Sequence, residues 1–376
     1  MYLKDLVEIQ MGQSPDSKFY NYDKIGLPFY QGKADFGRIN PTPKIWCMKS
    51  KKEAKPNDIL ISVRAPVGDL NINNAQSCIG RGLAAITCKS DVDMMYLYYY
   101  LKYLKPQLKH ISTGSTFESI NRTQLENLII DCKPFSEQIK ISNILQVVQR
   151  QIEVKENLLR LYNLLIKSRF VEMFGNPIIN DKKYPIFKLK DISQKIGSGF
   201  TPRGGDLNYI EEGIAFIRSM NIYNNTFKKE NLVYIDEFLA NQLSQVELFS
   251  GDLLLNITGA SVARCCTVPG DILPARVNQH VCIIRQCRIS SVFLEYCLTN
   301  ESYQEYLLLL SNKNGATREA LTKTQVENLE VIFPPLLEIA RFEKIVEQIN
   351  KLKSDVQKSI DETQLLMDSL MQEYFG

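Results

Sequence analysis

The chain has 376 residues, of which 44% are hydrophobic and 23% charged, with a formal net charge of +3 at pH 7. This length exceeds one ordinary domain, and the composition is that of a folded protein of about two domains, which excludes wholesale disorder and a fibrous architecture. The small positive charge permits nucleic-acid binding without arguing for it.

The chain shows no sign of export or of a membrane span. Its first residues lack the apolar core of a signal peptide, and no later stretch approaches the roughly 20 apolar residues that cross a bilayer. The nine cysteines include no C-x-x-C pair, so we expect reduced and mostly buried thiols. These features predict a cytoplasmic protein without membrane contacts.

Residues 1–134 predict a mixed α and β segment. Short apolar runs bounded by turn residues at 27–30, 58–63 and 82–87 are typical of buried strands. A helical pattern follows at 94–108, and 293–310 occupies the corresponding place in a second segment of the same kind.

Two long stretches without proline or glycine, 136–174 and 336–375, each predict a helix of about 40 residues, or about 60 Å. Their apolar residues are spaced alternately by three and four, which predicts a coiled-coil seam ending near Met173 and Tyr374. The seam residues are Ile141, Leu145, Val148, Ile152, Leu159, Tyr162 and Ile166 in the first stretch, and Phe342, Val346, Ile349, Val356, Ile360, Met367 and Leu370 in the second. The helices pair with each other, parallel or antiparallel, or each packs on its own module.

The chain contains an internal repeat. The hexapeptide Thr-Gln-Leu-Glu-Asn-Leu at 123–128 returns at 324–329 as Thr-Gln-Val-Glu-Asn-Leu, and Glu-Met-Phe-Gly at 172–175 returns at 373–376 as Glu-Tyr-Phe-Gly. Insertions separate the copies in their front parts, whereas the rear parts keep length and register. The repeat predicts four segments: a first domain at 1–134, a helix at 135–176, a second domain at 177–335 and a helix at 336–376.

Several enzyme chemistries lack their residues here. Asn176 and Pro177 begin a tetrapeptide that resembles the catalytic motif of DNA-amine methyltransferases, but the second proline and the aromatic residue are missing, so a helix stop is the better interpretation. The glycines at 197–205 fit no phosphate-binding fingerprint. His110 and His280 have no metal-ligand spacing around them, and no compact nuclease cluster is present, so we expect neither a metal nor catalysis.

The motifs, taken in order, resemble those of the specificity subunit of Type I restriction-modification systems. The first copy carries Pro-Asn-Asp-Ile-Leu-Ile-Ser-Val-Arg-Ala-Pro-Val-Gly at 56–68 and Cys-Ile-Gly-Arg-Gly-Leu-Ala-Ala-Ile at 78–86. Gly-Ala-Thr-Arg at 315–318 and the Phe-Gly endings of both helices are also similar to the family. The second copy departs from the first, with Thr-Gly-Ala-Ser at 258–261 in place of Arg-Ala-Pro-Val and Asn-Gln-His at 278–280 near the place of Gly-Arg-Gly.

The resemblance implies an α+β fold with two tandem target-recognition domains, held apart by two long helices that form an antiparallel coiled coil with a pseudo-two-fold axis. Each domain would read one half of a bipartite, asymmetric DNA sequence, and the helices would set the spacing and dock methylation subunits, usually two. Those subunits carry the S-adenosylmethionine chemistry, and separate restriction subunits provide the motor and nuclease. This chain would bind double-stranded DNA and no cofactor.

Side chains that read base edges carry paired donors or acceptors, typically Arg, Lys, Asn or Gln on loops or strands of the front segments. The candidates are Lys18, Gln31, Lys33, Arg38, Arg64 and Arg81 in the first module, and Arg203, Arg218, Asn221, Arg264 and Arg318 in the second. Each of them is alternatively a solvated surface charge or, at Arg64 and Arg81, a structural bond. A protein-binding scaffold and a stand-alone DNA methyltransferase are the competing functions.

Overall fold

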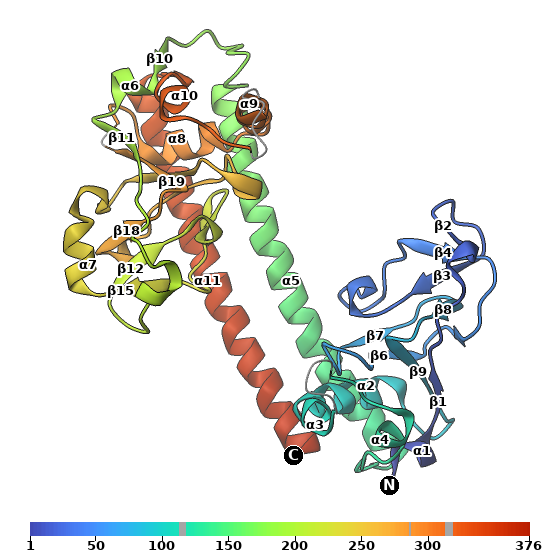
Figure 1. The fold of residues 1–376 in the computed structure, drawn as a ribbon. Coiled ribbons are helices and arrows are strands. Elements are labelled where there is room, and N and C mark those ends of the chain that lie inside the picture. Colours follow the sequence, from blue (N-terminus) through green and yellow to red (C-terminus); the bar gives the residue numbers. More distant parts are fainter. Residues whose placement is uncertain (113–117, 286, 313–318) are drawn as a thin grey trace. The chain divides into compact units, whose positions relative to one another are not determined.

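A computed structural model describes residues 1–112, 118–285, 287–312 and 319–376. The chain divides into two compact units. Unit 1 comprises residues 1–157 and 356–376, and unit 2 comprises residues 158–355, so that each unit includes part of both long helices (Figure 1). The units therefore do not coincide with the four segments predicted from the repeat. In the described residues, no helix combines the length and apolarity that crossing a membrane requires.

Unit 1 is built on two sheets. The first is antiparallel, in the order β1 (Val7–Met11), β9 (Leu83–Cys88), β6 (Ile59–Ser62) and β7 (Leu70–Ile72). The second has the order β2 (Tyr20–Asn21), β4 (Ile45–Cys47), β3 (Leu27–Tyr30), β8 (Ser77–Ile79) and β5 (Glu53–Ala54), and its β3 and β8 are parallel. All four residues of β6 are buried, because this central strand has neighbours on both of its edges and both of its faces are covered.

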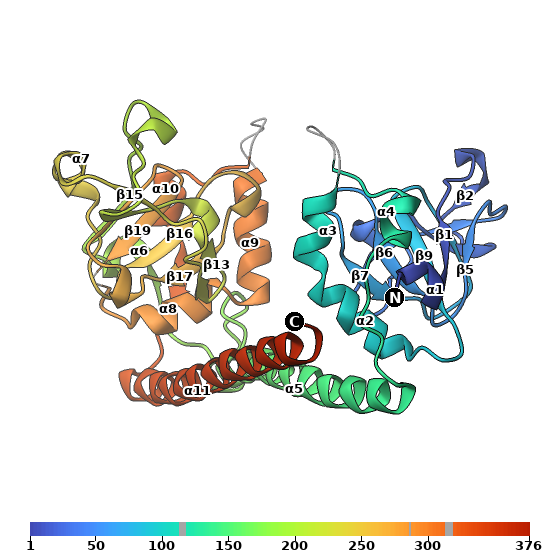
Figure 2. The same ribbon diagram turned by 90° about the horizontal axis from the view of Figure 1, so that it is seen from below.

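The helices of unit 1 lie around the four-stranded sheet (Figure 2). They are α1 (Leu3–Leu6), α2 (Met94–Tyr103), α3 (Lys105–Ile111) and α4 (Arg122–Glu126), with short 3-10 turns η1 (Ser17–Phe19) and η2 (Lys33–Asp35). The helix predicted at 94–108 is thus two helices. Pro106 stands in the first turn of α3, where a missing backbone N–H is tolerated, and the chain turns there because proline cannot continue α2.

Unit 2 repeats this topology. Its antiparallel sheet has the order β11 (Lys195–Ser198), β19 (Val281–Arg285), β16 (Leu253–Asn256) and β17 (Cys265–Thr267), which matches β1, β9, β6 and β7. A second sheet contains β15 (Val233–Ile235), β12 (Ile214–Ile217) and β18 (Ala275–Val277), and its β12 and β18 are parallel as β3 and β8 are. The module duplication inferred from short motifs is therefore confirmed in the strand order.

Smaller elements complete unit 2. Two strand pairs join β13 (Ile222–Tyr223) to β14 (Thr226–Phe227) and β10 (Ile186–Lys188) to β20 (Glu330–Ile332). The helices are α6 (Leu189–Ile192), α7 (Glu237–Gln242), α8 (Ser291–Leu298), α9 (Glu301–Asn312) and α10 (Lys323–Glu327). The 3-10 turns are η3 (Gly205–Asn208), η4 (Ser219–Asn221), η5 (Ser244–Val246), η6 (Gly259–Ser261) and η7 (Gly270–Ile272).

The two long helices are α5 (Phe135–Phe174) and α11 (Leu336–Phe375), each of 40 residues. After α5 the chain turns at Gly175, whose φ of 71° lies in the left-handed region and whose added Cβ would lie 2.2 Å from Oδ1 of Asp181. The side-chain oxygen of Asn176 then accepts the backbone N–H of Ile178 and of Ile179, at 2.9 and 3.1 Å. The helix stop predicted at Asn176 and Pro177 is confirmed, and Asn176 serves a turn.

Burial follows the predicted seam in part. Ile141, Leu145, Val148, Ile152, Ile166, Phe342, Val346, Ile349, Ile360 and Met367 are buried, while Leu159, Tyr162, Val356 and Leu370 are half-buried. Near the C-terminal ends the buried residues move to Phe170 and Phe174 in α5 and to Met371 and Phe375 in α11, whereas Met173 and Tyr374 are half-buried. A straight helix with 3.6 residues per turn drifts away from a 3.5-residue repeat, which explains the shift.

Each helix end packs into the core of one unit. In unit 1, the ring of Phe375 lies 4.8 Å from that of Tyr100 and 5.4 Å from that of Tyr96, both on α2. In unit 2, the ring of Phe174 lies 4.9 Å from that of Phe293 on α8 and 5.5 Å from that of Phe342 on α11. Such aromatic contacts bury large apolar areas and anchor the long helices to the modules.

Candidate nucleic-acid interface

Four loops converge in unit 1 at the ends of β1, β3, β6 and β8, and we call them loop cluster 1: residues 12–15, 31–33, 64–68 and 80–82. Three backbone N–H groups tie them together, donated by Gly80 to the Tyr30 carbonyl (2.8 Å), by Arg81 to Oγ of Ser14 (3.3 Å) and by Val63 to the Gly82 carbonyl (2.9 Å). A Cβ added to Gly82 would lie 2.3 Å from the carbonyl oxygen of Gln31, so only glycine permits this close approach.

Unit 2 holds the same arrangement, loop cluster 2: residues 199–202, 218–221, 258–262 and 278–280. The three equivalent N–H groups are donated by Asn278 to the Ile217 carbonyl (3.0 Å), by Gln279 to Oγ1 of Thr201 (3.5 Å) and by Ile257 to the His280 carbonyl (2.9 Å). The clusters therefore share a backbone frame and differ in side chains. Four of the equivalent pairs are Gln31 with Arg218, Arg64 with Thr258, Arg81 with Gln279, and Gly82 with His280.

Three of the six candidates in the first module have acidic partners. Lys18 lies 3.1 Å from Asp16, Lys33 lies 2.8 Å from Asp69, and Arg38 pairs with Glu153 and Glu156 of α5. A neighbouring carboxylate offsets part of the positive charge with which such a side chain attracts DNA. These ion pairs favour local roles for the three residues.

The other three candidates are exposed and differently placed. Within the described part of unit 1, the side chains of Gln31, Arg64 and Arg81 make neither a hydrogen bond nor an ion pair, and all three belong to loop cluster 1, as Lys33 does. Exposed guanidinium and amide groups without protein partners keep their hydrogen-bonding capacity for another molecule.

In the second module, two arginines are engaged with aromatic rings. The guanidinium of Arg218 donates to the Asn231 carbonyl at 2.7 Å and lies 5.4 Å from the centre of the Tyr209 ring. Arg264 lies 4.4 Å from the centre of the Tyr223 ring. Arg203 is exposed in the loop after β11, and Arg318 lies outside the described residues.

The prediction that Asn221 reads a base needs correction. Its side chain is fully buried, and its amide donates to the carbonyls of Lys228 (3.0 Å) and Glu230 (3.3 Å). Its side-chain oxygen accepts the backbone N–H of Arg218 at 3.1 Å. Because every group that could read a base is used inside the protein, Asn221 holds the loop and does not present itself to DNA.

Sequence reasoning missed Gln279 as a candidate. It is exposed at the tip of loop cluster 2. The motifs place residues 278–280 near the position of residues 80–82, and the strand register, which aligns Ile79 with Val277, fixes Gln279 as the counterpart of Arg81. The neighbouring Thr258 and His280 are bonded to each other, with 2.6 Å between Oγ1 and Nδ1.

Asp69 follows loop cluster 1 and binds two lysines, Lys33 on η2 and Lys105 on α3. Burial raises the pKa of the Asp69 carboxyl, but hydrogen bonds from Lys105 and Lys33 outweigh it and lower that pKa overall, so the group is ionised at neutral pH. The equivalent residue in unit 2 is Arg264. The carbonyl of Asp69 accepts the N–H of Ser62 at the end of β6, and the carbonyl of Arg264 accepts the N–H of Asn256 at the end of β16. The two modules thus carry opposite charges at one position.

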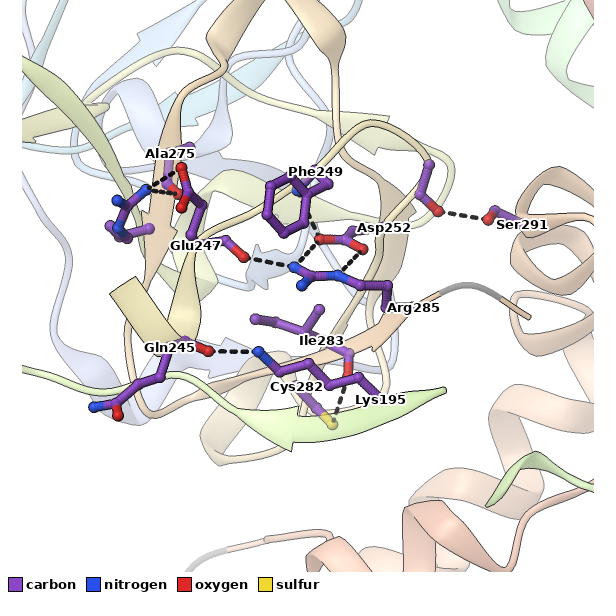
Figure 3. Close-up of polar contacts among 12 residues, drawn as sticks. Lys195, Gln245, Glu247, Phe249, Asp252, Ala275, Cys282, Ile283, Arg285 and Ser291 are labelled. Atoms are coloured by element: carbon purple, nitrogen blue, oxygen red, sulfur yellow. Dashed lines mark hydrogen bonds and ion pairs between the residues drawn. The ribbon is translucent and has the colours of Figure 1, made fainter. Parts of the chain in front are cut away.

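Figure 3 shows a polar cluster of unit 2. Several of its residues line a cavity of about 380 Å³. Nε and Nη2 of Arg285 donate to the two carboxylate oxygens of Asp252, both at 2.7 Å, and the guanidinium lies 4.2 Å from the centre of the Phe249 ring. Lys195 donates to the Gln245 carbonyl nearby. Since the charges are matched within the fold, this cluster supports β16 and β19 and shows no reactive group.

The cysteines and the possible metal ligands are further candidate functional groups of the chain. All nine cysteines are free thiols, and burial raises the pKa of Cys282 and of Cys297 to about 12, which keeps both protonated. Among the residues that the structure describes, no group of three or more His, Cys, Asp or Glu side chains is placed to hold a metal ion.

A duplicated α+β module with a matching loop cluster in each copy, and a 40-residue helix after each copy, defines a class of tandem-module proteins. Residues 1–161 and 181–364 match the family described as the Type I restriction modification DNA specificity domain. The chain belongs to this family, and the recognition made from its motifs is confirmed.

Similar proteins agree with this assignment. The putative type I restriction enzyme MjaX specificity subunit of Methanocaldococcus jannaschii is 46% identical over 149 residues, which cover 39% of this chain and 35% of that protein. The Type I restriction enzyme MjaIX specificity subunit of the same organism is 25% identical over 402 residues, covering 98% of this chain and 90% of that protein. The crystal structure of a Type-I restriction-modification system S subunit from M. genitalium shares the fold, with a TM-score of 0.56 at 14% identity over 100% of this chain and 95% of that chain.

Proposed function

We propose that this chain is the non-catalytic DNA sequence-specificity subunit of a Type I restriction-modification complex. Each module reads one half of a bipartite, asymmetric site in double-stranded DNA through its loop cluster. The observation that carries the proposal is the pair of loop clusters, which share three backbone hydrogen bonds but present different side chains. One frame with two sets of side chains suits two unrelated half-sites.

The long helices set the distance between the half-sites in this proposal. Their equal length of 40 residues, about 60 Å each, supports the role of a spacer. In unit 1, Nζ of Lys155 on α5 donates to the Ser359 carbonyl (3.1 Å) and to Oγ1 of Thr363 (2.6 Å) on α11. Leu145, ten residues before Lys155 on α5, shares a core with Met371, which comes after Thr363 on α11. The two helices therefore run in opposite directions here, which supports an antiparallel coiled coil with pseudo-two-fold symmetry.

The helices also dock two methylation subunits, which bind S-adenosylmethionine, and restriction subunits join that assembly. Exposed apolar residues on both helices support this role. Leu164 and Leu165 on α5 are 49% and 43% exposed, and their repeat counterparts Leu365 and Leu366 on α11 are 69% and 50% exposed. An apolar pair repeated at equivalent positions fits two copies of one partner, because exposed apolar patches mark protein contacts.

The test is selection from a randomised DNA duplex library by the full chain in complex with its methylation subunit. We expect a split, asymmetric motif with a fixed spacer, and binding that weakens as salt is raised, because phosphate contacts release counterions. The methylation subunit alone is the control and should select no such motif. A well-folded complex that selects no sequence would support the scaffold function instead. Binding of S-adenosylmethionine by the isolated chain would support a stand-alone methyltransferase.

A further inference from the structure

We infer that Arg81 and Gln279 are the equivalent specificity-determining residues of the two modules, with Arg81 reading a guanine in one half-site and Gln279 an adenine in the other. This inference rests on the proposed function. It follows from the shared frame of the two loop clusters, which gives the two residues the same place.

The backbone at this position has the same kind of hydrogen-bond partner in both modules. The N–H of Arg81 donates to Oγ of Ser14 at 3.3 Å and that of Gln279 to Oγ1 of Thr201 at 3.5 Å, so a hydroxyl of equivalent residues contacts each loop tip. Glycines permit the close packing behind the tips. A Cβ on Gly12 would lie 2.1 Å from the Gly80 carbonyl oxygen. A loop tip that the fold already places in this conformation loses less backbone entropy on binding.

The side chains of both residues are exposed and free within the described part of their own unit. Arginine donates two hydrogen bonds to O6 and N7 of guanine, and glutamine pairs with N6 and N7 of adenine. Neither contact requires an internal ion pair to be broken first.

In the other three pairs, at least one of the two side chains has a partner within the protein or is absent. Arg218, the counterpart of Gln31, is bound to the Asn231 carbonyl. Thr258, the counterpart of Arg64, is bound to His280. Gly82, the counterpart of His280, has no side chain. Among these four pairs, Arg81 with Gln279 is thus the pair in which both side chains keep their full hydrogen-bonding capacity within the described residues.

The experiment repeats the library selection with the full chain and its methylation subunit, using Arg81→Gln and Gln279→Arg. We expect Arg81→Gln to change guanine to adenine at one position of one half-site, and Gln279→Arg to make the converse change in the other half-site. The preference should shift by roughly 5- to 100-fold, which is the discrimination that one bidentate contact provides. In each variant the other half-site should stay the same.

Arg122→Gln and Lys323→Gln are matched controls, because these exposed residues occupy equivalent places on α4 and α10 and pair with Glu126 and Glu327. Both controls should select the wild-type motif. An unchanged motif in Arg81→Gln or Gln279→Arg would overturn the inference while leaving the proposed function intact, whereas a wild-type complex without any motif would overturn the proposed function. If Arg81→Gln loses all specific binding, Arg81→Lys decides: a weakened guanine preference at one position supports the inference, and an unaltered motif contradicts it.

Discussion

Removing one partner of the buried ion pair of unit 2 should destabilise the protein strongly. Removing both partners should cost less than the sum of the two single losses. The side chains of Asp252 and Arg285 are 1% and 12% exposed, and two hydrogen bonds of 2.7 Å join them. Asp252→Ala leaves a buried guanidinium without its carboxylate, and Arg285→Met leaves a buried carboxylate without its cation. Each change should lower the free energy of unfolding by about 3–5 kcal/mol.

The double variant should lose less than the sum of the single losses, by roughly 1–3 kcal/mol, because no unpaired charge remains. Urea unfolding followed by circular dichroism measures these energies. The chain's single tryptophan, Trp46 in β4, makes fluorescence a separate report on unit 1. Strictly additive losses would refute the reasoning that stranded charges cause the cost.

Two controls calibrate this cycle. Asp58 is the unit 1 counterpart of Asp252, but it accepts hydrogen bonds from Thr87 and from the Lys55 N–H and faces no arginine in the described structure. Asp58→Ala should therefore cost about 1–3 kcal/mol, the penalty for unsatisfied donors. Asp271 pairs with Lys229 on the surface, with both side chains more than half exposed, so Asp271→Ala should cost about 0–1 kcal/mol.

Three further predictions concern the helices and a buried acid. Phe375→Ala should lower the free energy of unfolding by about 3–5 kcal/mol, measured by urea unfolding, because the ring packs against Tyr96 and Tyr100. Burial raises the pKa of the Glu295 carboxyl in the folded protein above its usual 4.5. Between pH 4.5 and that raised pKa, Glu295 ionises in the unfolded chain but stays protonated in the folded one, so the free energy of unfolding should fall as pH rises through this range. Glu295→Gln should remove that component from unfolding curves measured across this pH range. Replacing Leu365 and Leu366 with glutamate should reduce the bound methylation subunits from about two to one, as measured by native mass spectrometry.

Each of these predictions has a result that contradicts it. Val171→Ala is the control for Phe375→Ala, since Val171 is 48% exposed near the end of α5. If both variants lost the same free energy of unfolding, packing of the Phe375 ring would not explain the effect. Parallel pH profiles of the wild type and Glu295→Gln would show that Glu295 does not titrate as argued. Two bound methylation subunits after the glutamate replacements would place docking elsewhere.

Local signals in the sequence were sufficient for much of the fold. The strand predicted at 27–30 is β3 with the same bounds, and the long stretches free of proline and glycine are α5 and α11. The repeat predicted the duplicated module, and the matching strand order of the two antiparallel sheets confirms it. The seam was less accurate at its ends, where Phe375 is buried in place of Tyr374, since a fixed heptad frame ignores the drift of a straight helix.

The candidate site was only partly predictable, because partners distant in sequence decide which side chains are free. Arg38 pairs with Glu156, which stands 118 residues later, and nothing near Arg38 signals this contact. Asn221 has the residue type of a base reader but is buried by the turn that it supports. Gln279 was not among the candidates although the motifs place residues 278–280 near residues 80–82, because the exact pairing with Arg81 depends on strand register across insertions of unequal length.

The most direct measurement of the central claim is single-molecule methylome sequencing of cells that express this chain together with a Type I methylation subunit, compared with cells that express the methylation subunit without this chain. The account predicts a split, asymmetric methylated motif that appears only when this chain is present. Unchanged methylation despite a well-folded complex would contradict the account.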